Sequence, residues 1–436
     1  PVRREDLLTV FSGSADSKPL SRCATAPPRG ASAAAAVCRH DPSCENGAME
    51  RPQAFHCSEI KIIFPLKMRK ANAARIKKIL TFQQGAKKQV ENISSALLDW
   101  FYKNHRILPF RTDPSPYHVW LSEIMLQQTR VSAALPYYER FLAALPDIPA
   151  LAACEEEKLH KLWEGLGYYS RVRNLQKAAR IVCEQYGGQL PADYDALRAL
   201  PGIGDYTAGA VASISFGIPV PAVDGNVLRV FSRLYNDPAA VTEPAVKKAF
   251  TARVMEHQPP DAPGDYNQAL MELGALVCVP NGAPLCEKCP LAHLCAARAA
   301  GTALELPRKA APKPRRLQPV TLALLESPAG FLLQQRPQKG LLAGLWQPVL
   351  WEGEALAAGE VLARLQAMGL DTGTAAPEAL PAAKHIFSHI EWHMNGILLH
   401  VPAQDAPAGC VWASREALQA EYTLPGAFKS YKKLMV

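Results

Sequence analysis

Long hydrophobic runs are missing from this sequence. No apolar stretch approaches the roughly 20 residues that a helix needs to cross a lipid bilayer, and the first residues lack the apolar core of a secretion signal. These two absences argue against an integral membrane protein and against a secreted one. We therefore expect a soluble protein that works inside the cell and has no membrane partner.

A strong excess of one charge is also missing. The 48 basic and 40 acidic residues of the 436-residue chain leave a formal net charge of +8. This mild excess is compatible with an acidic partner such as a nucleic acid, but it does not point to one. The hydrophobic content of 48% is enough for two buried cores. We therefore expect two folded domains and an extension.

Residues 1–88 lack a sustained hydrophobic period of either helical or strand spacing. The segment is rich in Ala, Ser, Pro and Arg, a composition that buries too little apolar surface to offset the entropy cost of folding. We predict that residues 1–88 form a disordered N-terminal extension.

Helical periodicity begins near residue 90, where Ile93, Leu97 and Phe101 recur at the spacing of one helix face. Further segments follow, each closed by Pro or Gly and long enough for a helix. We expect helices over residues 117–135, 137–144, 155–163, 170–186, 194–199, 226–235 and 265–277. Residues 89–300 are therefore predicted to be a mainly helical domain.

Glu123 is out of place in the helix expected from residue 117. Its neighbours three and four positions away are mostly apolar: Val119, Trp120, Leu126 and Gln127. Burial on such a face would raise the pKa of Glu123, as in a general acid. The alternative is a carboxylate that reaches the rim of this face and pairs with Arg130 or another basic residue.

Two glycine-containing strings lie near the centre of the helical domain. Residues 200–204 read Leu-Pro-Gly-Ile-Gly, which predicts a tight hairpin before a helix, with backbone N–H groups around Gly202 and Gly204 free to bind a phosphate. Residues 223–227 read Val-Asp-Gly-Asn-Val, so Asp224 comes directly before a helix and its carboxylate can point into a cleft. Asp224 could equally be the N-cap of that helix.

Tyr168 and Tyr169 stand beside Arg171 and Arg173 in a glycine-containing string over residues 165–174. Aromatic rings can stack on bases and guanidinium groups can hold phosphates, so this string indicates a nucleic-acid contact. A glycine-rich turn with core tyrosines is the alternative.

Cysteine is concentrated in one short stretch. Four of the eleven cysteines are Cys278, Cys286, Cys289 and Cys295, separated by seven, two and five residues. This spacing is typical of a metal or cluster site in a reducing compartment. Four thiolates suit either zinc or an iron–sulfur cluster.

A second domain follows a change in composition. Residues 301–317 are rich in Pro, Lys and Arg and are predicted to be an extended basic linker. Residues 318–436 are expected to be an α+β domain with a helix near residues 361–368 and two β-hairpins, one of them turning at Asn395-Gly396. The expected strand pairs are residues 320–325 with 331–335, and 390–394 with 397–401.

In this order, the strings resemble the MutY-type adenine DNA glycosylases of the helix-hairpin-helix superfamily. The resemblance covers residue 90 to the C-terminus and is carried by residues 108–111, 116–130, 165–174, 200–210, 224–227 and 278–295. It implies a catalytic domain with a helix-hairpin-helix DNA glycosylase fold, a six-helix barrel and a [4Fe–4S] module over residues 278–295. It also implies that residues 318–436 are a Nudix-like domain that recognises 8-oxoguanine.

The resemblance further implies an activity in base excision repair. A monofunctional glycosylase of this kind would hydrolyse the N-glycosidic bond of adenine mispaired with 8-oxoguanine or guanine in double-stranded DNA. We expect it to be a cytoplasmic monomer, associated with the nucleoid if the source is bacterial.

Matching positions carry over the family's catalytic roles. Glu123 resembles the acid that protonates adenine and later handles water, and Asp224 resembles the carboxylate that stabilises the sugar cation or a covalent intermediate. Tyr206 and Asn226 resemble residues that support these two.

The other matches imply contacts with DNA and with the cluster. Arg111 would lie near the adenine pocket, and Gln128 and Tyr168 would enter the duplex as wedges beside the extruded adenine. Phe387, Ser388 and His389 would contact 8-oxoguanine. The implied [4Fe–4S] ligands are Cys278, Cys286, Cys289 and Cys295.

The sequence departs from the family at three places. The first cysteine gap has seven residues instead of six, and Phe110 stands where the family has Trp. Residues 353–368 lack the glutamate-rich helix that a Nudix hydrolase needs for its metal. We therefore expect the C-terminal domain to hydrolyse nothing.

Three other functions compete with this interpretation. A bifunctional glycosylase and lyase resembling endonuclease III would act on oxidised pyrimidines, but it needs a lysine nucleophile where this chain has Tyr206. A non-catalytic DNA-binding protein would not need both Glu123 and Asp224. A Nudix-type nucleotide hydrolase is disfavoured by the missing glutamates.

Overall fold

The computed structural model describes residues 93–311 and 313–435. The extension expected over residues 1–88 lies outside these ranges. Within them, no helix is both long and apolar enough to cross a bilayer. A helical part comes first along the chain, and a part built on a β-sheet begins at residue 316.

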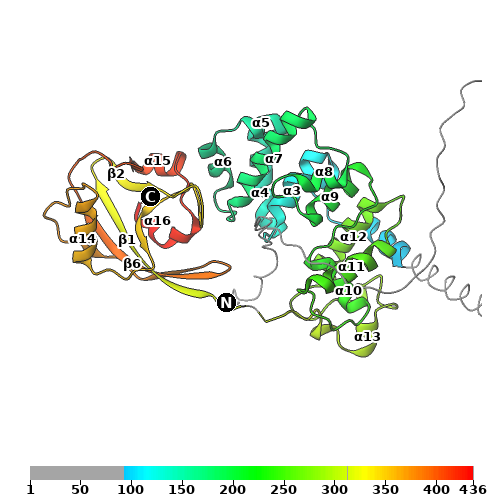
Figure 1. Cartoon of the computed structure of the whole chain (residues 1–436). Helices are drawn as coiled ribbons and strands as arrows, with labels where there is room; N and C mark the ends of the chain where they lie inside the picture. The colour runs from blue at the N-terminus through cyan, green and yellow to red at the C-terminus, as the bar shows by residue number, and fades with distance from the viewer. Residues whose placement is uncertain (1–92, 312, 436) are drawn as a thin grey trace, which may run out of the picture. The chain divides into compact units, whose positions relative to one another are not determined.

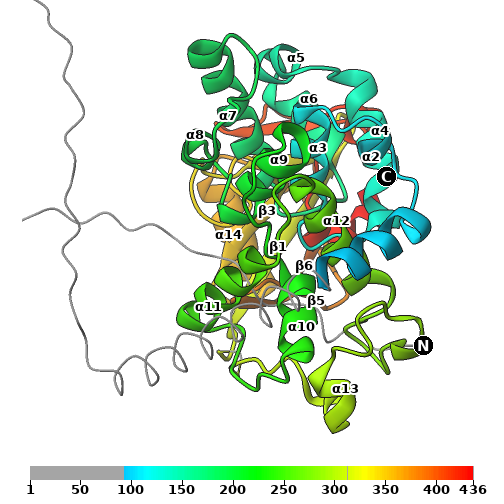
Figure 2. The same ribbon diagram turned by 90° about the vertical axis from the view of Figure 1, so that its right-hand side faces the viewer.

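One group of helices, the first helical lobe, packs around a core that contains Trp120, Phe141 and Trp163. Figures 1 and 2 show these helices together, in cyan to green. They are α2 (Pro109–Thr112), α3 (Pro116–Leu126), α4 (Val131–Ala144), α5 (Ile148–Ala153), α6 (Glu156–Trp163), α7 (Ser170–Tyr186), α8 (Tyr194–Ala199) and α9 (Asp205–Phe216).

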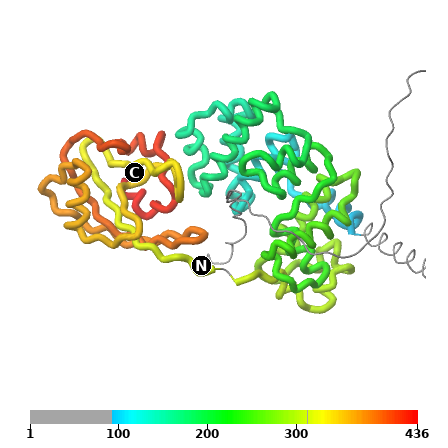
Figure 3. Tube along the Cα trace, viewed as in Figure 1, coloured from blue at the N-terminus to red at the C-terminus, as the bar shows by residue number. Residues whose placement is uncertain are grey.

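A second helical lobe packs around a separate core that contains Phe231, Phe250 and Tyr266. The helix over residues 93–104 belongs to this lobe, because Ile93, Leu97 and Phe101 share its core. Figure 3 shows the blue start of the described chain beside its later green segments. The other members are α10 (Gly225–Leu234), α11 (Pro244–Glu256), α12 (Pro263–Leu276), η1 (Cys286–Lys288), α13 (Ala296–Ala300) and η2 (Ala303–Glu305).

The helix expected over residues 117–135 is wrong, because two helices occupy this region. α3 ends at Leu126 and α4 begins at Val131, and Gln128 between them has a φ of 58°, outside the helical range. The segment expected over residues 137–144 is the end of α4. Pro136 lies inside α4, where a proline removes one backbone hydrogen bond of the helix.

Five of the other expected helices are present near their expected bounds, whereas α5 and α11 were not expected from the sequence. The segments expected over residues 155–163, 170–186, 194–199, 226–235 and 265–277 correspond to α6, α7, α8, α10 and α12. Gly187 ends α7 in the left-handed conformation, as the closing glycine predicted, and the structure adds a cap at α8, where the Asp193 side chain accepts from the Ala196 N–H.

The C-terminal part is a mixed β-sheet with the strand order β4-β6-β1-β3-β2-β7, and β5 also pairs with β6. The central strand β1 (Arg316–Ser327) runs parallel to β6 (Ile390–His400) and antiparallel to β3 (Trp346–Glu352). The remaining strands are β2 (Gly330–Gln335), β4 (Glu378–Ala379), β5 (Ala383–Ile386) and β7 (Cys410–Ala413).

Helices cover both faces of this sheet. Leu322 of β1 belongs to the core that contains residues of α15 and α16, whereas the next residue, Ala323, belongs to the core with α14. Figure 1 shows α14 on one side of β1 and α16 on the other. The helices of this part are α14 (Ala358–Ala367), α15 (Arg415–Ala420), η3 (Gly426–Phe428) and α16 (Lys429–Met435).

The hairpin expected at Asn395-Gly396 is wrong. β6 runs through this point without a break, and the two residues pair with Thr321 and Leu322 of β1. A Cβ added at Gly396 would lie 1.9 Å from the Leu322 carbonyl oxygen. Glycine is needed there for the close approach of two strands, not for a turn.

The first expected hairpin is confirmed, since Ser327 of β1 pairs antiparallel with Gly330 of β2. Part of the linker expected over residues 301–317 is regular structure instead. Its last residue, Leu317, belongs to β1 and pairs with Glu391 of β6, because the backbone groups of β6 have no other partner strand on that side at this position.

Candidate active site

Glu123 is buried inside the first helical lobe. The residue is 7% exposed on α3, and the Tyr206 hydroxyl on α9 donates a hydrogen bond to its Oε2. Burial raises the pKa of Glu123 to about 7, although the hydrogen bond from Tyr206 acts in the opposite direction. The expected burial is confirmed, and the alternative of a rim position beside Arg130 is wrong.

Asp224 precedes α10 and is its N-cap. Its Oδ1 accepts a hydrogen bond of 2.8 Å from the Val227 N–H, and its Oδ2 accepts one of 2.6 Å from the Asn226 amide. Burial raises the pKa of Asp224, while these two donors act to lower it. The capping interpretation is therefore confirmed. It does not remove Asp224 from the site, because its charge also raises the pKa of Glu123.

The two helical lobes meet at these carboxyl groups. Glu123 and Tyr206 come from the first lobe, and Asp224 and Asn226 come from the second. α9 and α12 pack against each other and hold the lobes together. Such a site can donate a proton from one carboxyl group and stabilise positive charge with the other.

A buried ion network lies beside this pair. Glu272 on α12 is 0% exposed and accepts hydrogen bonds from the Arg106 guanidinium at 2.7 Å and from Arg111 Nη2 at 2.8 Å. The two arginines hold the pKa of Glu272 at about 2, even though burial acts to raise it. Arg111, expected near the adenine pocket, is thus fixed in place, and its charge lowers the pKa of Glu123.

Arg229 joins the active site to the cysteine loop. Its Nη2 donates to Asn226 Oδ1 at 2.8 Å, and its Nε donates to the Cys278 carbonyl oxygen at 2.8 Å. Asn226 is therefore oriented from both sides, because its amide group donates to Asp224 and its oxygen accepts from Arg229.

The glycine hairpin expected over residues 200–204 is present. The Ile203 N–H donates to the Leu200 carbonyl oxygen at 3.1 Å, and Gly202 has a φ of 78°, which favours glycine. Gly204 is the N-cap of α9 and has no side chain to occupy the first N–H groups of that helix. The arrangement leaves these N–H groups available to an anion.

Gln128 and Tyr168 are both exposed. Gln128 lies in the turn after α3, and Tyr168 lies in the turn before α7 with 44% of its surface exposed. Both have positive φ, 58° and 49°. Side chains at such positions are available to a partner.

Arg171, three residues after Tyr168, does not face solvent. Arg171 is buried and donates only to backbone carbonyl groups, so the prediction that it holds a phosphate is wrong. Tyr169 is buried as well, as the core-tyrosine alternative stated. Sequence spacing failed here because α7 turns Arg171 toward the end of α3.

The four cysteines gather at the edge of the second lobe. Each is partly buried and unpaired, and three of them pack against the lobe's core. Burial, and then the charges of the other three thiols, raise the pKa of Cys289 to about 12, so the four lie near one another. In the described part of the chain, however, no three His, Cys, Asp or Glu side chains are close enough to hold one metal ion.

Phe387, Ser388 and His389 form the loop between β5 and β6. The Phe387 N–H donates to the Ile390 carbonyl oxygen at 2.8 Å and closes the loop, while the Phe387 ring packs on Trp392 with centroids 5.0 Å apart. Ser388 and His389 are exposed, and their side chains lie 3.2 Å apart. The two polar groups are thus presented on a supported hairpin.

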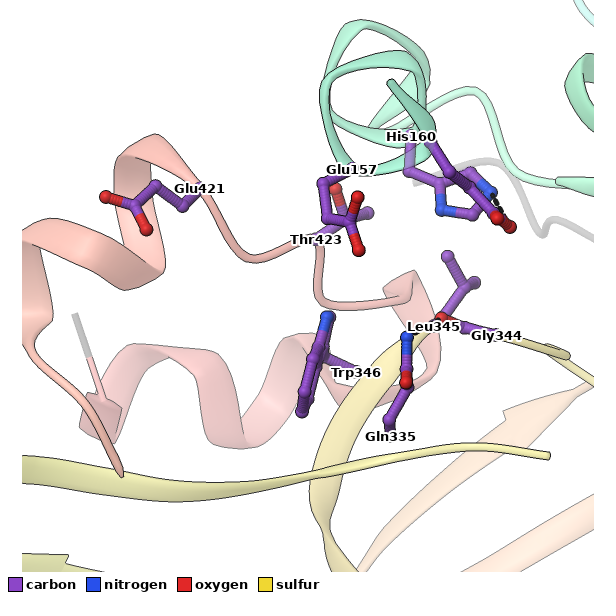
Figure 4. A pocket seen from close by; sticks show the side chains of 9 residues that line it. Glu157, His160, Gln335, Gly344, Leu345, Trp346, Glu421 and Thr423 are labelled. Atoms are coloured by element: carbon purple, nitrogen blue, oxygen red, sulfur yellow. Dashed lines mark hydrogen bonds and ion pairs between the residues drawn. The ribbon is translucent and has the colours of Figure 1, made fainter. Parts of the chain in front are cut away.

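A small pocket elsewhere does not overlap these residues. Figure 4 shows its lining, which includes Glu157 and His160 of α6, Trp346 of β3, and Thr423. Its volume of about 10 Å³ has room for one water molecule at most. The pocket therefore cannot hold a nucleobase.

Comparison with known proteins shows which family this chain belongs to. The family described as "HhH-GPD superfamily base excision DNA repair protein" matches residues 121–255, and the NUDIX domain matches residues 320–434. The sequence is 36% identical to the adenine DNA glycosylase of Homo sapiens over 389 residues, which is 75% of this chain and 71% of that protein. The chain belongs to the adenine DNA glycosylase family. The family's member in Buchnera aphidicola subsp. Acyrthosiphon pisum is 31% identical and covers 71% of this chain and 87% of its own length.

Membership of the adenine DNA glycosylase family makes this chain a DNA glycosylase of base excision repair with a Nudix-like C-terminal domain. Two solved structures are also similar. A thermostable thymine-DNA glycosylase is 27% identical with a TM-score of 0.44 and covers 49% of this chain and 98% of its own. Endonuclease III in a non-covalent DNA complex is 26% identical with a TM-score of 0.42, covering 49% and 97%.

Sequence reasoning missed Arg106, Glu272 and Arg229. Glu272 carried the same signal as Glu123, an acid among apolar helical neighbours, and could have been found by the same criterion. No local signal distinguished Arg106 or Arg229 from an exposed arginine, because Glu272 and the Cys278 carbonyl group, which they bind, come from distant parts of the chain.

Proposed function

We propose that this chain removes adenine mispaired with 8-oxoguanine or guanine from double-stranded DNA by hydrolysing the N-glycosidic bond. The observation that carries the proposal is the buried pair of Glu123, which holds a proton near neutral pH, and Asp224, with Tyr206 donating to Glu123. Adenine as the base is supported by the similarity of this chain to the adenine DNA glycosylases of Homo sapiens and Buchnera aphidicola.

The chemistry divides between the two carboxyl groups. Glu123 donates its proton to the adenine ring, and the base departs with the electrons of the glycosidic bond. The sugar is left with oxocarbenium character, and the negative charge of Asp224 stabilises it. The Glu123 carboxylate then accepts a proton from the water whose oxygen bonds to the sugar, which restores the starting state.

Asn226 and Tyr206 support these steps. Asn226 donates to Asp224 Oδ2 and so favours its ionised form, and Tyr206 keeps Glu123 oriented. Tyr206 also supports a monofunctional mechanism, since a phenol cannot form the Schiff base that a lyase needs.

DNA would be gripped by groups around the site. The free N–H groups at Gly202 and Gly204 suit a backbone phosphate, and Arg111 would lie against the flipped adenine. Gln128 and Tyr168 would fill the space that the adenine leaves. We infer that a single chain carries out the reaction as a monomer. We also infer that it works in the compartment that contains the DNA.

The four cysteines are proposed to hold a [4Fe–4S] cluster. The donor set fits, because four thiols lie near one another at the edge of the second lobe and a [4Fe–4S] cluster takes one Cys on each of its four irons, so the thiols need not be close enough to share a single ion. When bound, the cluster would supply no proton or nucleophile and would tie residues 278–295 to the lobe. Four iron atoms per chain are expected in metal analysis, and zinc would contradict the proposal.

The C-terminal domain is proposed to read the base opposite the adenine. A Nudix hydrolase needs a glutamate-rich helix for its metal, but α14 carries a single glutamate, Glu360. The Glu360 carboxylate accepts a hydrogen bond from the Ala357 N–H and caps its own helix. The exposed Ser388 and His389 can donate and accept hydrogen bonds, as reading the altered N7 and the added oxygen of 8-oxoguanine requires.

The test uses three duplexes with adenine opposite 8-oxoguanine, guanine or thymine. We expect alkali-labile abasic sites with the first two, an uncut strand before alkali, and no adduct trapped by borohydride. A strand cut without alkali, together with a trapped adduct, would assign the bifunctional mechanism instead. Absence of abasic sites with all three duplexes would reject the proposed function.

A further inference from the structure

Arg171 on α7 has an unusual environment for a charged side chain. The residue is 9% exposed, and none of the ion pairs among residues 93–311 and 313–435 includes it. Its guanidinium lies 5.2 Å from the Trp163 ring centre, and burial lowers its pKa to about 10. Its hydrogen bonds go to the backbone carbonyl groups of Ile124, Met125, Gln127, Leu166 and Gly167.

These carbonyl groups belong to two separate turns. Nη1 donates to the end of α3, at 2.8 Å to Ile124 and 2.7 Å to Gln127. The last carbonyl groups of a helix have no partner within it and carry partial negative charge, so a buried cation is favourable there. Nη2 donates to Leu166 at 3.2 Å and to Gly167 at 3.1 Å, in the turn before α7.

Each of the two turns contains a non-glycine residue in the left-handed conformation. In the first turn this residue is Gln128, directly after a carbonyl group that Arg171 binds, and in the second it is Tyr168, also directly after one. Non-glycine residues keep this conformation only when the surrounding structure imposes it. Both side chains are exposed, and the Tyr168 ring also contacts Arg171, whose guanidinium carbon lies 5.7 Å from the ring centre.

We propose that Arg171 is a positioning residue that clamps these two turns together and so presents Gln128 and Tyr168 to the duplex as one preformed pair. The inference rests on the proposed function, in which these two side chains enter the DNA. It also gives α7 a role in the chemistry without contact with substrate, because the clamped carbonyl groups end the helix that carries Glu123.

The clamp depends on the two donor nitrogens of the planar guanidinium group. One group donates to both turns at once from two nitrogens, whereas a lysine ammonium is a point charge that cannot reproduce this geometry. We therefore expect Arg171→Met to release both turns and Arg171→Lys to restore binding only in part. Arg180→Met is the matched control, since Arg180 lies on the same helix and donates to a single carbonyl group, that of Ala152.

The first experiment measures adenine release and base extrusion. In single-turnover assays on an adenine:8-oxoguanine duplex, Arg171→Met should raise the protein concentration for half-maximal rate at least tenfold. The rate of adenine release by Arg171→Met at saturating protein concentration should fall by a smaller factor than this. In the Glu123→Gln background, the fluorescence of 2-aminopurine placed beside the adenine should rise less with Arg171→Met than with Arg180→Met.

The outcomes separate the two claims. If the unaltered chain releases no adenine, the proposed function fails. If it does release adenine and Arg171→Met behaves like Arg180→Met in both assays, the clamp is wrong.

The second experiment reads the turns without DNA. In the unaltered background, Gln128→Gly should melt a few degrees above Gln128→Ala, because glycine alone adopts the left-handed conformation at no cost. In the Arg171→Met background this difference should vanish, since the released turn can leave that conformation. An equal difference in both backgrounds would overturn the proposal. If Arg171→Met does not fold, the same comparison is made in Arg171→Lys.

Discussion

Two buried glutamates, one on α3 and one on α12, show how neighbours decide what a carboxyl group does. Glu123 is 7% exposed and Glu272 is 0% exposed, and both lie among apolar helical residues. Yet the pKa of Glu123 is raised to about 7 and that of Glu272 is lowered to about 2. Burial alone therefore predicts neither the charge nor the role.

The difference lies in the partners. Glu123 accepts one hydrogen bond from the neutral Tyr206 and feels the charge of Asp224, so the cost of burying an ionised carboxylate dominates. Glu272 accepts from Arg106 and Arg111, and the two cations outweigh the same cost. Glu123 therefore keeps a proton near neutral pH, whereas Glu272 keeps its negative charge.

The largest expected effect comes from replacing Glu123 itself. Glu123→Gln should lower the rate of adenine release by a factor of roughly 10²–10⁴, the usual contribution of general acid catalysis, because the amide cannot donate the proton. Single-turnover excision measures it, with the exposed Glu139→Gln on α4 as control. A near-normal rate would show that another group is the acid.

The corresponding change in the region of Glu272 should act on stability. Glu272→Gln leaves Arg106 and Arg111 without their carboxylate and should cost about 3–5 kcal/mol at pH 7, the scale for breaking a buried ion pair. Urea unfolding measures the loss. Glu354→Gln, which breaks the exposed pair with Arg364, should cost much less.

The pH dependence of this loss has a definite sign. The folded pKa of Glu272 is depressed, so its stabilisation is present above the unfolded pKa of about 4.3 and is lost as the pH falls toward 2. The difference between Glu272→Gln and the unaltered chain should shrink over that range. A difference that stays constant would mean that Glu272 is not ionised in the folded protein.

The same linkage gives Glu123 the opposite sign. Its folded pKa is raised, so folding becomes less favourable as the pH rises from about 4.3 through 7. Glu123→Gln should therefore be more stable than the unaltered chain at pH 8, by up to about 3 kcal/mol for a shift of this size. The two curves should merge below pH 4. A less stable variant at pH 8 would contradict the raised pKa.

A change in the loop between β5 and β6 should leave the pKa values of Glu123 and Glu272 unaltered. Replacing Ser388 and His389 by Ala should lower the preference for 8-oxoguanine over guanine by about 1–3 kcal/mol, the usual scale for reading one base edge. Excision rates below saturation on the two duplexes give the ratio. An unchanged ratio would show that this loop does not read the opposite base.

The smallest expected effect is a change in the pKa of Glu123 that leaves this carboxyl group in place. The hydrogen bond from Tyr206 lowers the pKa of Glu123, so Tyr206→Phe should raise that pKa further above about 7. The rate of adenine release, which needs protonated Glu123, falls as the pH rises through this pKa. The variant should keep its rate to a higher pH, and a shift to lower pH would reverse the assigned role of Tyr206.

Local patterns were enough for much of the fold and part of the site. The apolar neighbours of Glu123 predicted its burial, and Asp224 before a helix predicted the cap. Short-range rules succeed at such positions because a helix sets which side chains share a face and where its free N–H groups lie. The same rules failed at Asn395-Gly396, where the strand partner β1 and not a turn requires glycine.

The sequence by itself therefore determined the burial of Glu123, the cap at Asp224 and the approximate bounds of most of the expected helices. Only the tertiary structure decided their charges and contacts. Arg106 and Glu272 are 166 residues apart, and Arg171 binds carbonyl groups more than 40 residues earlier in α3. The physical reason is that the pKa of a buried group depends on the few atoms that touch it, and those atoms come from other helices.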